Sequence, residues 1–208
     1  MSRIVLDIDG VMAGFVEGAN RLALDMTGKA LASPALCWNW LTEGPGETLT
    51  PEENKALWDC IGKSDTFWVD LPELPHAGAL VTAANRWLAK GHDVIFLTTR
   101  TRGVDIKAQT DVWLQQAGVD LPRTILIAGN KGEVLAALKA DVFVDDYAPN
   151  ILDACAKSPN TNCILLAQPW NADATEEIDR AGALRLGPEA TTWAIDTFLG
   201  TGKGWRDV

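Results

Sequence analysis

Two pairs of aspartates are the residues of this sequence whose types and spacing most directly indicate chemistry. Asp7 and Asp9 end an apolar run near the N-terminus, and Asp145 and Asp146 end a second apolar run much later in the chain. Like charges this close repel one another, so several carboxylates held together are costly unless a cation or a proton relieves them. Carboxylate oxygens are ligands of the kind that Mg²⁺ prefers, and bound Mg²⁺ commonly contacts a substrate phosphate as well. These four residues are therefore candidate metal ligands.

Hydroxyl and ammonium groups occupy comparable positions. Thr98 and Thr99 end another apolar run, and Lys131 begins a helix-like segment. Structural explanations exist for each group: threonine favours strands, aspartate caps helices, and a lysine can simply be solvated on a helix surface. A shared function is favoured because all of them fall at corresponding ends of alternating elements. Lys139 competes with Lys131, but a lysine at the C-terminal end of a helix is already explained by the helix dipole.

Apolar runs and segments of helical period alternate along most of the chain. Short, almost continuously apolar runs are typical of parallel strands covered on both faces. The predicted strands are residues 3–8, 93–99, 124–129, 141–146 and 162–168. The predicted helices are residues 77–90, 104–117, 131–139, 148–157 and 188–199. This order favours an α/β fold with a doubly wound parallel sheet, in which ligands bind beyond the carboxyl ends of the strands.

Residues 16–75 interrupt the alternation. They contain helix-like stretches at 16–27 and 50–61 and four of the nine tryptophans. We predict that this segment is a small helical cap inserted after the first strand. Residues 1–15 and 76–208 would then form the catalytic core.

Composition argues against several functional classes. The formal net charge is −10 at pH 7, which disfavours an extended nucleic-acid groove because such grooves need clustered Lys and Arg. No apolar run approaches the ~18 residues of a membrane span, and the N-terminus lacks the pattern of a cleaved signal peptide. The four cysteines form no CxxC pair, so we expect reduced thiols and a cytoplasmic location. A homodimer is compatible with the sequence but not indicated by it.

The segments "VLDIDGV", "VIFLTT", Lys131 and "VFVDD", in this order, resemble the four motifs of the haloacid dehalogenase (HAD) superfamily of phosphatases. The insertion after the first motif is similar to the superfamily's C1 cap type. "DIDGVMAGF" together with "FWVDLPELPHAGAL" (residues 67–80) resembles the 5′(3′)-deoxyribonucleotidase branch. The resemblance implies a HAD-like Rossmannoid core and a Mg²⁺-dependent phosphomonoesterase, in the first place a 5′-nucleotidase acting on (deoxy)ribonucleoside monophosphates. Two alternatives stay open: another small phosphomonoester (a sugar phosphate or a 3′-phosphate end), and a non-catalytic phosphate-ligand binder on the same fold.

The resemblance also implies roles for the aspartates. Asp7 would be the nucleophile that forms an aspartyl-phosphate. Asp9 would protonate the leaving oxygen and then accept a proton from the water that cleaves the intermediate. Mg²⁺ would be bound by Asp7, by the backbone carbonyl of Asp9, and by Asp145 and Asp146. Which member of the last pair binds it directly is left open.

Three further residues receive phosphate-binding roles from the resemblance. Thr98 and Thr99 would donate hydrogen bonds to phosphate oxygens, and Lys131 would neutralise charge that develops during transfer. The second motif departs from the branch, because "TTRTRG" has Arg100 where the branch tends to carry proline. Arg100 either contacts phosphate or pairs with surface acids. Trp170 follows the last predicted strand and either borders the site or belongs to a turn.

Aromatic residues of the cap are candidates for substrate contact. Phe15 lies where the branch carries an aromatic residue that stacks on the nucleobase. Trp38 and Trp40 share one face if their segment is extended, and could complete an aromatic slot. Alternatively these side chains form the cap's own core, which is the role that we expect for Trp58 and Trp68.

Overall fold

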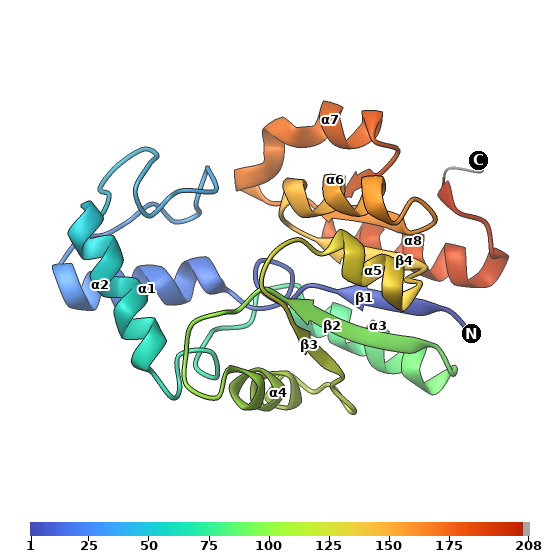
Figure 1. Cartoon of the computed structure of the whole chain (residues 1–208), viewed down its shortest axis with the longest axis horizontal. Coiled ribbons are helices and arrows are strands. Elements are labelled where there is room, and N and C mark those ends of the chain that lie inside the picture. The colour runs from blue at the N-terminus through green and yellow to red at the C-terminus, as the bar shows by residue number, and fades with distance from the viewer. Residues whose placement is uncertain (206–208) are drawn as a thin grey trace.

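A parallel six-stranded sheet forms the centre of the protein (Figure 1). The structure, a computed structural model, describes residues 1–205. The strand order is β3-β2-β1-β4-β5-β6. The bounds of the strands are β1 (Arg3–Leu6), β2 (Asp93–Thr98), β3 (Thr124–Leu126), β4 (Val142–Asp145), β5 (Asn162–Leu166) and β6 (Leu184–Leu186). Because β1 pairs with both β2 and β4, the three strands that carry the predicted motifs are neighbours.

Helices cover both faces of the sheet, and this confirms the predicted fold class. Alternate residues of β1 face opposite cores: Ile4 and Leu6 pack on one side, and Val5 packs on the other. The first face is covered by α3 (Ala77–Ala89), α4 (Ile106–Gln116) and α8 (Pro188–Thr201). The second is covered by α5 (Gly132–Leu138), α6 (Ala148–Lys157) and α7 (Thr175–Arg180). The middle residues of the central strands β1, β2, β4 and β5 are apolar and buried because helices cover both faces there, whereas the edge strands β3 and β6 are only partly buried.

The chain leaves the sheet between β1 and α3 and forms α1 (Phe15–Thr27) and α2 (Pro51–Lys63), which lie to one side of the sheet in Figure 1. The sequence specifies the start of α2 locally. The hydroxyl of Thr50 accepts a hydrogen bond from the Glu53 backbone N–H, and the Glu53 carboxylate accepts one from the Thr50 N–H. This capping box satisfies two donors that the first helical turn leaves unpaired.

The two ends of this insertion lie side by side. The Gly14 N–H donates to the Pro72 carbonyl at 2.7 Å, and the Leu74 N–H donates to the Met12 carbonyl at 2.8 Å. These bonds fall near the boundaries that the sequence predicts for a cap. The division into a core and a cap stays a prediction.

Several elements differ from the sequence expectation. β1 ends at Leu6 rather than at residue 8, because the Ile8 carbonyl accepts hydrogen bonds from the N–H groups of Met12 and Ala13 and turns the chain. β3 has three residues instead of the six expected for 124–129. The sequence also missed β6, α7 and the 3₁₀-helix Pro169–Ala174. These elements are too short to show a period that stands out from a loop.

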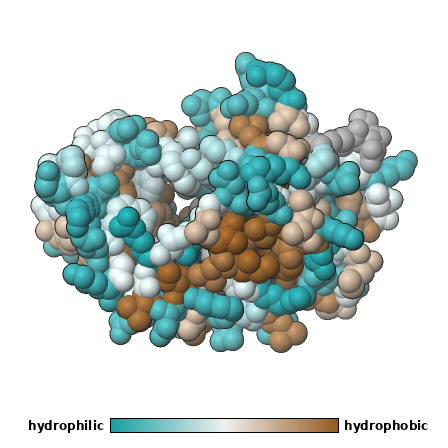
Figure 2. All heavy atoms as spheres, viewed as in Figure 1, coloured by the Kyte–Doolittle hydropathy of each residue, from teal (hydrophilic) through white to brown (hydrophobic). Residues whose placement is uncertain are grey.

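An apolar patch lies on the face shown in Figure 2, over the region of β2, β3 and α5 in Figure 1. Ile95, Ile125 and Leu138 line a hollow in this region. Within residues 1–205, no helix is both long enough and apolar enough to cross a membrane.

Candidate active site

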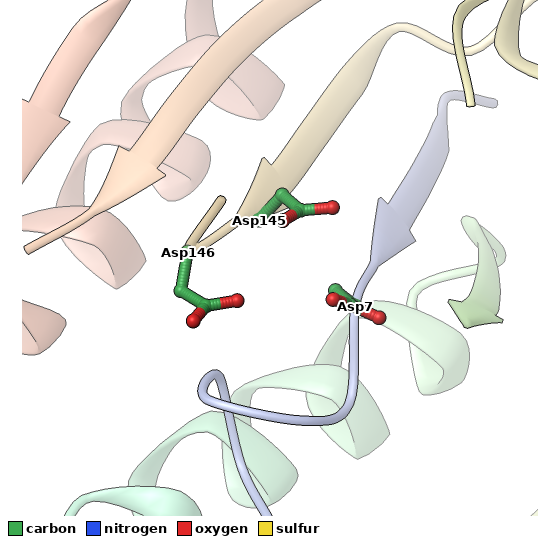
Figure 3. A group of neighbouring side chains, drawn as sticks. All are labelled: Asp7, Asp145 and Asp146. Atoms are coloured by element: carbon green, nitrogen blue, oxygen red, sulfur yellow. The ribbon is translucent and has the colours of Figure 1, made fainter. Parts of the chain in front are cut away.

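Three aspartates meet at the carboxyl edge of the sheet (Figure 3). Asp7 directly follows β1, Asp145 is the last residue of β4, and Asp146 follows it. One carboxylate oxygen of each lies within 4.8 Å of the other two, and all three residues are buried. We call Asp7, Asp145 and Asp146 the acidic cluster. Parallel strands place their carboxyl ends at one edge, which is why residues about 140 positions apart can meet there.

Burial and mutual repulsion perturb the acidic cluster. Burial, followed by the charges of Asp145 and Asp9, raises the pKa of Asp7 to about 7, although the Lys131 ammonium opposes this shift. The pKa of Asp146 is also raised, first by burial and then by the charges of Asp145 and Asp7. Burial disfavours the charged form of both carboxyl groups, and the Lys131 ammonium offsets this only in part.

Lys131 is the cation that the protein itself supplies to this cluster. It is fully buried, and its Nζ lies 2.8 Å from Asp7 Oδ1 and 2.7 Å from Asp145 Oδ2. Burial alone would lower the pKa of Lys131, but the carboxylates of Asp145 and Asp7 outweigh it and raise that pKa. Lys139, the competitor, is exposed at the C-terminal end of α5. Of the two lysines, the structure brings Lys131 to the acidic cluster.

The donor set fits a hard divalent cation. Three buried carboxylates lie together and one ammonium group contacts two of them, so the cluster and Lys131 carry a net charge of −2 when all three carboxylates are ionised. Both oxygens of Asp145 are engaged, by Lys131, by the Tyr147 N–H and by the Asn150 amide. Asp146 has a hydrogen bond from the Trp170 indole Nε1 to its Oδ2, at 2.9 Å. Clustered oxygen ligands with incomplete compensation are what a Mg²⁺ site requires.

Gly10 allows the loop after β1 to pass close to the acidic cluster. Its φ is +73°, and a Cβ built on it would lie 2.1 Å from Asp146 Oδ2. The Gly10 carbonyl accepts a 2.7 Å hydrogen bond from the Gln168 side chain. Only glycine combines this conformation with this approach. The loop thereby brings Asp9 to the same edge of the sheet.

Asp9 forms a bidentate salt bridge with Arg100 rather than with Lys131. Arg100 Nε donates to Asp9 Oδ2 at 2.9 Å, and its terminal NH2 nitrogen donates to Oδ1 at 2.7 Å. Arg100 is buried, whereas the side chain of its partner Asp9 is partly exposed. From the sequence, we expected Arg100 either to contact phosphate or to pair with acidic residues on the surface. The structure gives it a carboxylate of the site as partner.

The two threonines of the second motif differ in environment. Thr98 is buried at the end of β2, where its carbonyl accepts a hydrogen bond from the Ile127 N–H. Thr99 is exposed. Thr98 ends β2 and Thr99 follows it, so both lie at the carboxyl edge of the sheet, as the acidic cluster does. Their predicted contact with phosphate stays a prediction.

A pocket of about 240 Å³ opens next to Asp9, Gly10 and Asp146. Aromatic rings from the insertion and from the segment after β5 make up much of its wall. They are Phe15, Trp38, Trp40, Trp58 and Trp170. The sequence offered two roles for Phe15, Trp38 and Trp40: contact with the substrate or packing within the cap.

The aromatic residues combine packing with lining. Phe15 stacks against Trp58 and Trp68, with ring centroids 5.8 and 5.7 Å apart. Trp40 is buried and packs edge-on against Phe15. Trp38 is 44% exposed and stacks on Tyr147 at 3.9 Å between centroids. Trp68 is buried, as expected for a core residue, whereas Trp58 also lines the pocket.

Sequence reasoning missed two contacts of the segments around the acidic cluster. Tyr147 follows the aspartate pair, and its ring stacks on that of Trp38. Its position next to the motif was a signal that could have placed it near the site. Trp170 was considered as a border residue, and the structure places it in the pocket wall and in contact with Asp146. Its place after a strand, at the edge where ligands bind, was the available signal.

Comparison with known proteins gives a fold but no sequence relative. No protein-family model matches the chain, and no curated protein matches it. A HAD family hydrolase from Deinococcus radiodurans R1, solved with bound phosphate and sodium, aligns with a TM-score of 0.57. The two proteins are 12% identical, and the match covers 92% of this chain and 93% of that one. The chain shares the overall fold of this hydrolase.

Two further structures support the same fold. A putative beta-phosphoglucomutase from Thermotoga maritima has a TM-score of 0.53 at 16% identity, over 95% of this chain and 99% of that chain. A putative beta-phosphoglucomutase from Bacteroides vulgatus has a TM-score of 0.53 at 13% identity, over 96% and 89%. Because identity is this low, the HAD likeness establishes architecture, and activity must be argued from the site.

Proposed function

We propose that this protein is a Mg²⁺-dependent phosphomonoesterase that acts through an aspartyl-phosphate. The observation that carries the proposal is the contact of Lys131 with both Asp7 and Asp145, beside Asp146, at the carboxyl edge of the sheet. A carboxylate nucleophile needs a site that neutralises an incoming phosphate, and phosphoryl transfer depends mainly on positioning and electrostatic stabilisation.

The reaction would proceed in two steps. An oxygen of Asp7 attacks phosphorus, the bond between phosphorus and the ester oxygen breaks, and Asp9 gives its proton to the departing oxygen. A water molecule then attacks the phosphorus of the aspartyl-phosphate and gives a proton to Asp9, which releases phosphate and restores Asp7. Lys131 would offset the negative charge on the phosphoryl oxygens. Thr98 and Thr99 would orient these oxygens through hydrogen bonds.

Asp7, Asp146 and the backbone carbonyl of Asp9 would hold Mg²⁺. We assign the direct bond to Asp146 rather than to Asp145, because three protein donors already occupy the Asp145 oxygens. Asp145 would then act on the cation through water. When bound, Mg²⁺ supplies positive charge that offsets the phosphate and lets the carboxylates lie close together.

For the substrate we propose a nucleoside monophosphate, with the protein acting as a 5′-nucleotidase. The pocket beside Asp9 and Asp146 supports this choice, because its wall is largely aromatic. Stacking of a base on aromatic rings contributes ~1–3 kcal/mol per base in single-strand binders. A sugar phosphate is the competing substrate class, and the aromatic wall gives it less reason to bind.

A phosphate-release assay tests the proposal. Purified protein is incubated with nucleoside 5′- and 3′-monophosphates, hexose phosphates and p-nitrophenyl phosphate, with Mg²⁺ or with EDTA. We expect Mg²⁺-dependent release, fastest from nucleoside monophosphates. Asp7→Asn should abolish release while preserving stabilisation by nucleotide. Turnover by Asp7→Asn would remove Asp7 as the nucleophile, and nucleotide binding without any turnover by the unaltered protein would indicate a binder instead of an enzyme.

A further inference from the structure

We infer that Arg100 is a positioning residue that fixes the orientation of the Asp9 carboxyl group in the site. The inference rests on the proposed function, because it assigns Arg100 a part in the proton transfers of that reaction. Both nitrogens on one side of the guanidinium group pair with both oxygens of Asp9, at 2.9 and 2.7 Å. This two-pronged geometry fixes the plane of the carboxyl group as well as its position.

The guanidinium group is itself held by two residues besides Asp9. Its NH1 nitrogen donates to the Thr110 hydroxyl on α4 at 3.1 Å. The Trp68 ring lies against it, with Arg100 Cζ 4.7 Å from the ring centroid. The Arg100 side chain has no exposed surface, whereas the Asp9 side chain is 22% exposed. Arg100 is therefore held rigidly, and it pairs with the more accessible Asp9 carboxylate.

The supporting residues are fixed in turn. The Thr110 hydroxyl donates to the Ile106 carbonyl within α4 at 2.7 Å. The Trp68 N–H donates to the Gln109 side chain at 3.0 Å. These bonds connect the end of β2, α4 and the segment that returns from the insertion. A side chain locked by packing and hydrogen bonds on several elements holds its partner more tightly than a solvated one.

The pairing leaves Asp9 able to serve the reaction. Each carboxylate oxygen has two lone-pair directions, so a fork from Arg100 leaves room for a proton or a reacting group on the other side. Asp9 lines the pocket and so faces the place of the departing group. The Arg100 side chain has no exposed surface, so it offers no atom to a ligand in this structure. Its action on the reaction would therefore pass through Asp9.

Leaving groups of different basicity separate this role from a direct phosphate contact. An alkyl phosphate needs a proton on its departing oxygen, whereas p-nitrophenolate leaves without one. We expect Arg100→Met to lower kcat/KM for an alkyl phosphate by about 10- to 100-fold, within the ~10²–10⁴-fold range of general acid–base catalysis. For p-nitrophenyl phosphate the loss should be less than about 3-fold. Inhibition by inorganic phosphate should be unchanged.

A double-mutant cycle tests whether Arg100 acts through Asp9. In an Asp9→Asn background, Arg100→Met should cause no further loss with the alkyl substrate, because the group it positions is already disabled. Arg100→Lys keeps the charge but cannot form the fork, so it should show the same dependence on the leaving group as Arg100→Met. Arg86→Met, which removes an exposed pair with Asp196 on distant helices, is the matched control and should leave both substrates unaffected.

The possible failures can be told apart. Absence of phosphate release by the unaltered protein with every substrate would refute the proposed function. Equal losses for both substrates, or a further loss in the Asp9→Asn background, would overturn the inference about Arg100 while leaving the proposed function standing. Weaker inhibition by inorganic phosphate in Arg100→Lys would show a direct phosphate contact instead. Thermal unfolding of Arg100→Lys and Arg100→Met checks that both remain folded at the assay temperature.

Discussion

Replacing Lys131 by methionine should lower the free energy of unfolding of the metal-free protein by about 3–5 kcal/mol, the usual cost of removing one partner of a buried ion pair. Lys131 is fully buried, and its ammonium group lies within 2.8 Å of Asp7 and 2.7 Å of Asp145. Methionine retains an unbranched apolar side chain, so the change removes mainly the charge. The carboxylates left behind would be buried without their cation.

The loss can be measured by thermal and urea unfolding in EDTA. For a chain of this size, ~1 kcal/mol shifts Tm by about 2–4 °C, so Tm should fall by about 6–20 °C. Mg²⁺ should recover part of the loss in the variant, because a bound cation compensates the same carboxylates. At 100 times the Kd, a ligand that binds only the folded state adds ~2.7 kcal/mol.

Lys139→Met is the matched control, because Lys139 lies at the other end of α5 and is exposed. We expect its unfolding free energy to change by less than about 1 kcal/mol, the limit for a favourable helix-end charge. If Lys131→Met unfolds within about 1 kcal/mol of the unaltered protein in EDTA, the ammonium group does not compensate the cluster. The electrostatic argument for the site would then be wrong.

Three further predictions concern the loop, the return segment and the pocket. Gly10→Ala and Gly28→Ala should each lower the unfolding free energy by ~1–2 kcal/mol because both glycines have a positive φ. Only Gly10→Ala should also weaken Mg²⁺ binding measured by calorimetry, because its Cβ would lie 2.1 Å from a carboxylate oxygen of the acidic cluster, whereas no atom lies near position 28. Burial lowers the pKa of His76 despite its hydrogen bond to a backbone carbonyl, so the unfolded chain binds this proton first as pH falls and the His76 contribution to the unfolding free energy decreases below about pH 6.5. The raised pKa values of Asp7 and Asp146 act in the opposite sense, so the test is a difference: the unfolding free energy of the unaltered protein minus that of His76→Gln should fall as pH drops below about 6.5 and stay constant above pH 7. Trp38→Ala should raise KM for nucleotides by about 5-fold or more, and KM for p-nitrophenyl phosphate by less, because the ring is expected to contribute ~1 kcal/mol or more of stacking on the base. Trp193, on α8, is 70% exposed, and Trp193→Ala is the control that should change neither KM. Equal effects of Trp38→Ala on both substrates would exclude a base contact.

The acidic cluster could be predicted from the sequence because it depends on a general property of parallel sheets. Once the apolar runs are identified as strands, the residues that follow them must meet at one edge, and Asp7, Asp145 and Asp146 do. Lys131 could be separated from Lys139 by position alone, since one begins α5 and the other ends it. These inferences need only the order of the elements.

The partner of Arg100 could not be predicted, because it depends on side-chain packing between segments 91 residues apart. A charged residue after a strand faces several acids in any sheet of this kind, and the sequence contains no signal that selects Asp9. The same holds for the contact between Trp38 and Tyr147, which joins the insertion to the start of α6. Such pairs are fixed by tertiary structure, where local patterns carry little information.

The pocket wall and the acidic cluster share their supporting residues, so the proposed function implies that binding of the leaving group and orientation of the carboxylates are coupled. Trp170 lines the pocket and donates to Asp146, and Trp38 lines it while stacking on Tyr147, whose N–H holds Asp145. A ligand that packs against these rings restrains the residues that hold the aspartates. Under the proposed function, binding energy from the part of the substrate remote from phosphorus could therefore be used at the reacting centre. By this reasoning a truncated substrate loses turnover as well as affinity.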